Sequence, residues 1–251
     1  MGDKNLALKR YLSNNQVFAD IFNLKFTRDG LTIDPQRLQD IDSVQVMSLP
    51  LKEGGRRGRR KTAFYRERIH DAAKAFMDNV NGSRPILMLG IEGQTSPSLV
   101  MALRILQYED HMLTFAMEMQ KKEIQDENGV DFLSGMSPEE QLPPVLSIVL
   151  HMGSKPWDGP TNLRQMLLKQ PRRLYNRMVN LSLNIVTMED ISRRNIDSFS
   201  SDIGVVAAYL IHGKNPDKLK KLKQKYKRFR NVSPEAINLI NEYTRLRINI
   251  P

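Results

Sequence analysis

The sequence predicts an α/β fold in which helices flank a small mixed β-sheet and a helical segment follows. Helical and strand patterns alternate over residues 1–190, which is typical of an α/β layer arrangement. Residues 191–251 show mainly helical patterns. The chain of 251 residues is 40% hydrophobic and 26% charged, as globular proteins are. This length suits one sizeable domain, or one domain with an appended module.

The N-terminal part predicts a helix, a tight helical turn and a basic loop. Residues 5–24 carry apolar side chains at helical spacing. Asp34 before Pro35 is typical of an N-cap followed by the first helical position, and the chain then becomes extended. Residues 51–61, "LKEGGRRGRRK", are expected to form a flexible basic loop.

Residues 68–91 predict a β-hairpin around Asn81-Gly82, because both residues of this dipeptide accept the positive φ that a two-residue turn requires. The alternative is a helix over residues 64–77, since the alanines around residue 73 are good helix formers. The residues alone leave both alternatives open.

A two-residue turn at this dipeptide would bring two carboxylates together. Paired residues would have numbers that add to 163, so Asp71 would lie opposite Glu92, with Cβ atoms about 5 Å apart. Gln94 would lie on the same face, whereas His70 would point to the opposite face and be structural. Two carboxylates this close need a cation, and their oxygens are ligands that Mg²⁺ accepts. The alternative is that one carboxylate simply faces solvent at a strand end.

The rest of the chain predicts helices and two further strands. Trp157, in "SKPWDGP", is expected to be a packing anchor. Gly213 is a helix stop, and Ser233 before a proline is an N-cap. We expect helices over residues 98–125, 200–213, 217–230 and 233–247, and strands over residues 143–153 and 179–188.

The charge favours a polyanionic partner. The net charge is +10 and the sequence pI is about 9.8, and nucleic acid is the commonest partner of such proteins.

Arg104 lies four residues from Tyr108 and so shares a helix face with it. The basic helix over residues 217–230 is a further DNA contact, a homodimer surface or a solvated face. The candidate DNA contacts are Arg56, Arg57, Arg59, Arg60, Lys61 and Arg104.

Several classes of protein are excluded or disfavoured. The absence of cysteine excludes disulfides, thiolate catalysis and zinc sites built on sulfur. No apolar run approaches the roughly 20 residues of a membrane helix, so no membrane partner is expected. The N-terminus lacks a secretory apolar core, and the expected compartment is the cytoplasm.

A series of ordered motifs resembles the Rpn family of recombination-promoting nucleases. The motifs run from "YLSNNQVFADIFN" through "HDAAK", "LGIEGQTS" and "FLSG" to "PPVLSIVLHMGSKPWDGPTNLRQML" and "VNLSLNIV". The similarity covers residues 5 to about 190. The family is also described as transposases and belongs to the PD-(D/E)xK nuclease superfamily, which associates it with recombination and mobile elements.

The resemblance implies a restriction-endonuclease-like core over residues 1–190, an α-helical C-terminal extension over residues 191–251, and Mg²⁺-dependent cleavage of DNA, with Mn²⁺ as a substitute. It places the metal on Asp71 and Glu92 and a catalytic role on Gln94. It also favours strands over the helix for residues 68–78.

Two departures from the family's pattern favour an alternative function. Gln94 stands where the superfamily has lysine, and a carboxamide can position water but cannot be its base. Gly93 removes a side chain that the family usually has, and His70 replaces an arginine before Asp71. The alternative is a catalytically degenerate nucleic-acid-binding protein that keeps the fold. Asp20, on the first helix, would either assist the metal or have a capping or packing role.

Overall fold

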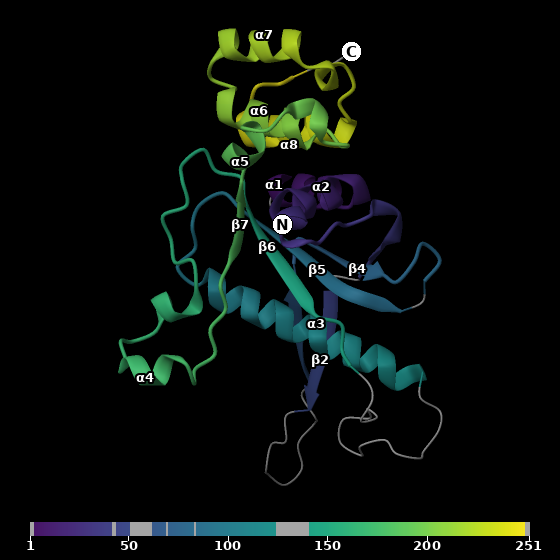
Figure 1. The fold of residues 1–251 in the computed structure, drawn as a ribbon, viewed down its shortest axis with the longest axis vertical. Coiled ribbons are helices and arrows are strands. Elements are labelled where there is room, and N and C mark those ends of the chain that lie inside the picture. The colour runs from purple at the N-terminus through teal and green to yellow at the C-terminus, as the bar shows by residue number, and fades with distance from the viewer. Residues whose placement is uncertain are drawn as a thin grey trace.

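The computed structural model has a central five-stranded sheet between two layers of helices (Figure 1). It describes residues 3–41, 44–50, 62–68, 70–82, 84–123 and 141–248. The expected basic loop and the candidate DNA contacts from Arg56 to Lys61 lie outside these residues. In the described part of the chain, no helix has both the length and the apolar character that crossing a membrane requires.

The main sheet is mixed, as expected. Its spatial order is β1-β4-β5-β6-β7. β4 is antiparallel to β1 and β5, whereas β5, β6 and β7 are parallel to one another. The strands are β1 (Leu38–Asp40), β4 (Ala72–Met77), β5 (Pro85–Gln94), β6 (Val145–His151) and β7 (Asn184–Thr187). β2 (Val44–Pro50) and β3 (Thr62–Arg68) form a separate antiparallel ribbon.

The register between β4 and β5 is the predicted one. Pairs from Ala72↔Ile91 to Phe76↔Leu87 all have numbers that add to 163. The helix considered over residues 64–77 is therefore wrong, because strands β3 and β4 occupy most of that range.

The predicted two-residue turn is also wrong, although its centre is right. The paired strands stop at Met77 and Pro85, with a register shift after residue 76. Asp78 Oδ1 accepts a hydrogen bond from the Asn79 amide at 2.8 Å, and Asn79 Oδ1 accepts one from the Asn81 amide at 2.9 Å. These side chains satisfy the backbone in place of the ladder, so the turn begins earlier than the dipeptide suggested.

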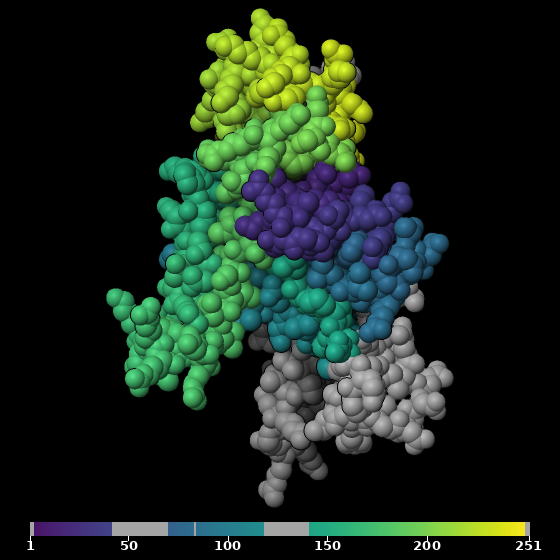
Figure 2. Space-filling model, viewed as in Figure 1, coloured from purple at the N-terminus to yellow at the C-terminus, as the bar shows by residue number. Residues whose placement is uncertain are grey.

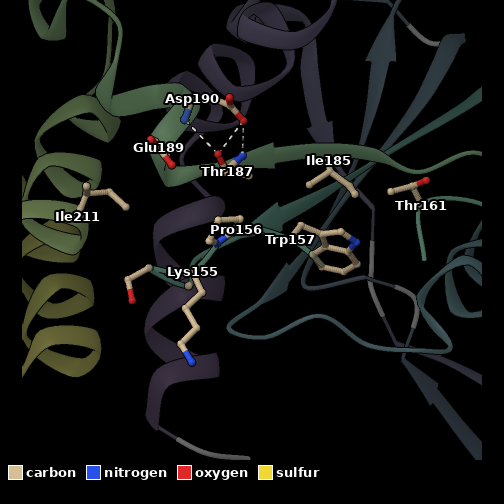
Figure 3. Close-up of a pocket in the computed structure, with 11 residues that line it drawn as sticks. Lys155, Pro156, Trp157, Thr161, Ile185, Thr187, Glu189, Asp190 and Ile211 are labelled. Atoms are coloured by element: carbon tan, nitrogen blue, oxygen red, sulfur yellow. Dashed lines mark hydrogen bonds between the residues drawn. The ribbon is translucent and has the colours of Figure 1, made fainter. Parts of the chain in front are cut away.

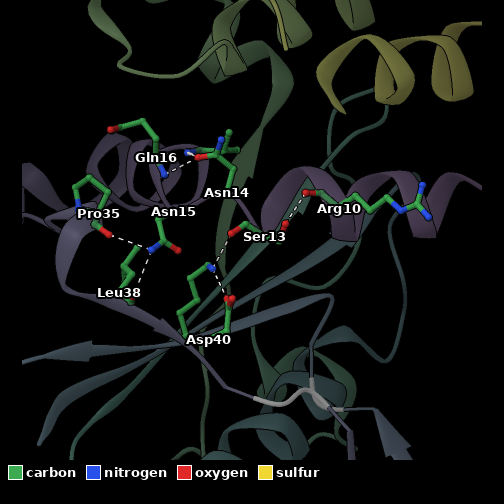
Figure 4. Close-up of polar contacts among 10 residues, drawn as sticks. Arg10, Ser13, Asn14, Asn15, Gln16, Pro35, Leu38 and Asp40 are labelled. Carbon is green, nitrogen blue, oxygen red and sulfur yellow. Dashed lines mark hydrogen bonds and ion pairs between the residues drawn. The ribbon is translucent and has the colours of Figure 1, made fainter. Parts of the chain in front are cut away.

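The N-terminal helical segment is two helices, α1 (Asp3–Leu12) and α2 (Asn15–Phe26), where one was expected. The break is at Asn14, whose Oδ1 accepts from the amides of Gln16 and Val17 and so caps α2. Asn15 then donates to the carbonyls of Pro35 and Leu38, at 3.1 and 3.0 Å (Figure 4). The second helix is thereby fixed to the turn that precedes β1.

The side chains of β4 and β5 alternate between the two helical layers. Phe76, Leu89 and Ile91 pack in the main hydrophobic cluster with α1 and α2. Ala73 and Met88 face the other layer, the long helix α3 (Met101–Glu123), with which they form a second cluster. This alternation puts every second residue of β5, Glu92 included, on the α3 side of the sheet.

The remaining helices follow β6. They are α4 (Arg172–Tyr175), α5 (Met188–Ser192), α6 (Ile203–His212), α7 (Pro216–Lys225) and α8 (Pro234–Thr244). Short 3₁₀ helices are η1 (Thr27–Asp29), η2 (Pro35–Arg37), η3 (Leu163–Met166), η4 (Ile196–Ser198) and η5 (Lys227–Arg230). The helix stop at Gly213 and the N-cap at Ser233 are confirmed. The strand expected over residues 179–188 is confined to β7.

The basic segment over residues 217–230 is not one helix. α7 ends at Lys225, and η5 follows after an extended residue, Tyr226. Asp197 accepts hydrogen bonds from the amides of Lys227 and Arg228, at 3.2 and 2.9 Å. These two amides therefore bond to a side chain of η4, and not to carbonyls of a continuing helix.

The C-terminal helices pack on the N-terminal ones through a buried carboxylate. Asp202, just before α6, accepts from the Tyr11 hydroxyl at 2.7 Å and from the amide and hydroxyl of Ser233 at 2.8 and 2.7 Å. Burial, then the charge of Asp202, raises the pKa of Tyr11 well above its ordinary value, so the hydroxyl keeps its proton. Figure 2 shows the N-terminal helices packed against the C-terminal ones, and both belong to the main cluster.

Removing this carboxylate should destabilise the fold. We expect Asp202→Ala to lower the free energy of unfolding by about 2 to 4 kcal/mol, because one buried and two partly buried donors lose a charged acceptor. Tyr11→Phe, which removes one of these bonds, should cost about 1 kcal/mol. Urea denaturation of both single variants and of the double variant measures the coupling. Strictly additive losses would contradict this role.

Candidate active site

Two of the predicted site residues lie at the carboxyl end of the central strand. Glu92 is nearly buried, with 5% of its surface exposed. Its Oε1 accepts a hydrogen bond from the side-chain Nε2 of Gln94 at 3.0 Å, so these side chains share a face as expected. β5 pairs with β6 as far as Gln94 and with β4 as far as Ile91. This pairing fixes the backbone from which the side chains of Glu92 and Gln94 project.

Asp71 reaches the same strand from the residue before β4. Its Oδ2 accepts a hydrogen bond from the Gly93 amide at 3.0 Å, so the carboxylate continues the ladder where β4 has not yet begun. The hydrogen-bonded pairs of β4 and β5 end at Ala72↔Ile91, one step short of Asp71 and Glu92. A Cβ at Gly93, which would point to α1, would lie 3.5 Å from Asp71 Oδ2, so this carboxylate lies toward α1 whereas Glu92 faces α3. The carboxylate itself turns to the backbone amide between Glu92 and Gln94.

Gly93 has a packing reason that the sequence did not reveal. A Cβ at this position would lie 2.1 Å from Leu8 Cδ2, on α1. The absent side chain therefore faces the N-terminal helices, on the other side of the sheet from Glu92. The glycine allows α1 to approach the strand closely.

Arg104 supplies a cation to this site. It lies on the first turn of α3, and its Nη2 forms an ion pair with Glu92 Oε1. The same guanidinium donates to the Tyr108 hydroxyl, with Nη2 at 3.0 Å and Nε at 3.3 Å. Burial, then the charge of Glu92, raises the pKa of Tyr108 above its ordinary value, so it remains a neutral hydroxyl. Arg104 therefore balances part of the negative charge for which the sequence suggested a metal ion.

His70 packs beneath this network. Its ring lies 4.8 Å from that of Tyr108, and a Cβ at Gly90 would come within 2.5 Å of the imidazole. His70 points to the opposite face from Asp71, as expected, because its ring packs on Tyr108 of α3 whereas Asp71 borders a pocket beside α1. His70 therefore shares the α3 face with Glu92. The expectation that it is structural agrees with its complete burial.

Asp71 also borders a pocket on the side of α1. The pocket has a volume of about 470 Å³ and is lined by Lys9, Ser13, Asp40, Ile41, Asp71, Ala72 and Ala73. Tyr243, on α8, is close enough to interact electrostatically with Asp71. Burial, then the charge of that carboxylate, raises the pKa of Tyr243 to about 12. Sequence spacing gave no signal for Lys9 or Tyr243, because only tertiary packing brings them to Asp71.

Two other sequence candidates have structural roles. Asp20 accepts from the amides of Ser200 and Ser201 and from the Ser201 hydroxyl, which agrees with the capping or packing alternative. Trp157 packs against Met101 and Ile105 of α3. It also lines a pocket of about 350 Å³, in which it lies beside Ile185, with Glu189 and Asp190 further away (Figure 3).

The oxygen donors of the site suit Mg²⁺ in type. Asp71 and Glu92 offer carboxylates and Gln94 offers a carboxamide, and Mg²⁺ is commonly held by one or two carboxylates with water completing its shell. Among the described residues, no group of three or more His, Cys, Asp and Glu side chains is arranged to hold a metal ion. The donor types therefore suit Mg²⁺, and one of the two carboxylates, that of Glu92, is already paired with Arg104.

Comparison with known proteins identifies no relative. No family model matches the chain, no curated protein matches it, and no solved structure matches it. The similarity to the Rpn nucleases therefore stays a prediction based on sequence motifs.

The buried imidazole should make stability depend on pH. Burial, then the charge of Arg104, lowers the pKa of His70 from 6.5 to about 3. As the pH falls below about 6.5, the unfolded chain binds this proton first, so the free energy of unfolding decreases until about pH 3. His70→Leu should therefore give a shallower decrease over this range, measured by urea denaturation at successive pH values. An NMR titration of His70 with a midpoint near its ordinary pKa would disprove the assignment.

Proposed function

We propose that this chain is a Mg²⁺-dependent DNA endonuclease that hydrolyses phosphodiester bonds. The observation that carries the proposal is the meeting of Asp71 with the Glu92-Gly93-Gln94 segment, where its carboxylate accepts from the Gly93 amide at 3.0 Å. The mixed α/β fold and the net charge of +10 also support it. The motifs that resemble those of the Rpn nucleases place the metal at the same residues.

The site residues would divide metal binding, water orientation and phosphate contact among them. Asp71 and Glu92 would hold Mg²⁺, or Mn²⁺ in its place. The bound ion supplies an activated water and neutralises charge on the phosphodiester. Gln94 orients water through its carboxamide but cannot remove the proton. Arg104, held by Tyr108 and one-third exposed, is positioned to contact a phosphate oxygen.

A second candidate is a nucleic-acid-binding protein that has lost catalysis. One specific contact favours it: Glu92 Oε1 already accepts from both Arg104 and Gln94. A carboxylate oxygen held by two donors is less available to a metal ion. Steeply salt-dependent DNA binding without cleavage would favour this candidate.

Nicking of supercoiled plasmid tests the first proposal. Wild-type protein should nick with Mg²⁺ and not with EDTA, and Asp71→Ala or Glu92→Gln should lower the rate by about a hundredfold or more, since each removes a proposed metal ligand. Asp110→Asn, which neutralises an exposed carboxylate on α3, is the matched control and should nick at the wild-type rate. Undiminished nicking by Asp71→Ala would refute the assignment.

Metal binding by an Arg104 variant tests whether the guanidinium competes for Glu92. The Arg104 side chain is 34% exposed, and such an ion pair contributes about 0.5 to 1 kcal/mol. Arg104→Gln should therefore bind Mn²⁺ about two- to fivefold more tightly, measured by electron paramagnetic resonance without DNA. Unchanged or weaker Mn²⁺ binding by this variant would mean that Arg104 does not compete with a metal ion.

A further inference from the structure

A basic arm, residues 159–183, extends from the sheet between β6 and β7. Its stem is a short two-stranded pairing: the Leu163 amide donates to the Leu181 carbonyl at 2.9 Å, and the Leu183 amide donates to the Thr161 carbonyl at 2.8 Å. Beyond the stem, η3 and α4 form the tip. In Figures 1 and 2 the arm projects away from the body of the molecule, at the lower left.

The arm carries half of the net charge of the chain. No aspartate or glutamate occurs between Asp158 and Glu189, whereas five cations do, so this stretch contributes +5 of the total +10. Four of the five are exposed, and in the part of the chain that the structure describes none of these four forms an ion pair. The cations are Arg164, Lys169, Arg172, Arg173 and Arg177.

Contacts within the tip order the backbone that carries the exposed cations. Arg164 Nη2 donates to the Tyr175 carbonyl at 2.7 Å, and its guanidinium lies 5.4 Å from the centre of the Tyr175 ring. The Tyr175 hydroxyl in turn accepts from the Gln170 amide at 3.1 Å. These bonds tie η3 and the intervening loop to α4, which carries two of the arginines. The exposed charges are therefore presented by an ordered scaffold.

The root of the arm packs on the helix that serves the candidate active site. Leu181 and Leu183 belong to the hydrophobic cluster of Met101 and Ile105 on α3. Arg104 lies between those two residues of α3 and pairs with Glu92. The arm and the carboxylate site therefore share one face of the sheet and one helix.

We propose that the basic arm binds the phosphate backbone of duplex DNA and guides it to the face that bears Glu92. The exposed arm residues Lys169, Arg172, Arg173 and Arg177 would contact phosphates. The choice of DNA as the polyanion rests on the proposed function. A lipid surface fits less well, because α4 has four residues and lacks the length of an interfacial amphipathic helix. A symmetric contact between two arms would oppose like charges.

Salt-dependent DNA binding tests this inference. The arm variant combines Lys169→Gln, Arg172→Gln, Arg173→Gln and Arg177→Gln. The control variant combines Arg10→Gln, Arg28→Gln, Arg194→Gln and Lys214→Gln, which removes the same charge from exposed cations outside both the arm and the basic segment over residues 217–230. Fluorescence anisotropy with a duplex of about 30 base pairs, in EDTA and from about 50 to about 250 mM KCl, gives the affinity and its salt slope.

The arm variant should lose affinity about tenfold or more. Its slope of log affinity against log salt should be shallower by about 3.6, because each of the four lost phosphate contacts removes about 0.9. The control variant should change much less. Equal losses in both variants, or none in the arm variant, would overturn the inference. Arm-dependent binding to phosphatidylserine vesicles without arm-dependent DNA binding would also overturn it.

The outcome is independent of catalysis. Because EDTA removes divalent metal, arm-dependent binding by a protein that never nicks plasmid would support this inference and reject the endonuclease. Metal-dependent nicking together with unaltered DNA binding by the arm variant would reject the arm alone.

Discussion

The pairing of β4 with β5 is the constraint on which the candidate site depends. Side chains alternate along a strand, so a slip of one residue would move Glu92 from the α3 face into the apolar cluster of α1 and α2. Burying a carboxylate there without a partner would cost several kcal/mol. The apolar residues Leu89 and Ile91 would move to the opposite face at the same time. The register that brings Asp71 to the Gly93 amide is therefore enforced by the hydrophobic core.

Charge balance at the site is provided by the chain itself. A nearly buried Glu92 needs compensation, and Arg104 supplies it from α3, with Tyr108 holding the guanidinium in place. The fully buried ring of His70, which is neutral, packs against the Tyr108 ring. The same arginine that stabilises the carboxylate would compete with a metal ion there, so the two proposed functions differ in the strength of one contact.

The C-terminal helices are joined to this site as well as to the core. Asp202 connects α1 to the start of α8 through Tyr11 and Ser233. α8 also brings Tyr243 to Asp71, where the carboxylate helps to raise the pKa of the tyrosine. The helical segment that looked like an extension in the sequence thus packs against α1 and contributes to the surroundings of Asp71. Residues from both ends of the chain, Lys9 and Tyr243, therefore contribute to the surroundings of Asp71.

The sequence by itself determined the mixed α/β class, and it gave the register of the hairpin around residue 81 once a hairpin is assumed, because apolar patterning and turn residues act locally. It left a helix open for residues 64–77, and pairing with β5 decided for the strand. It did not determine the turn itself, since the side chains of Asp78 and Asn79 bond to the backbone and displace it from Asn81-Gly82. The tertiary structure alone decided that Arg104 pairs with Glu92 and that Gly93 makes room for Leu8. Such contacts join segments distant in sequence, and no local spacing encodes them.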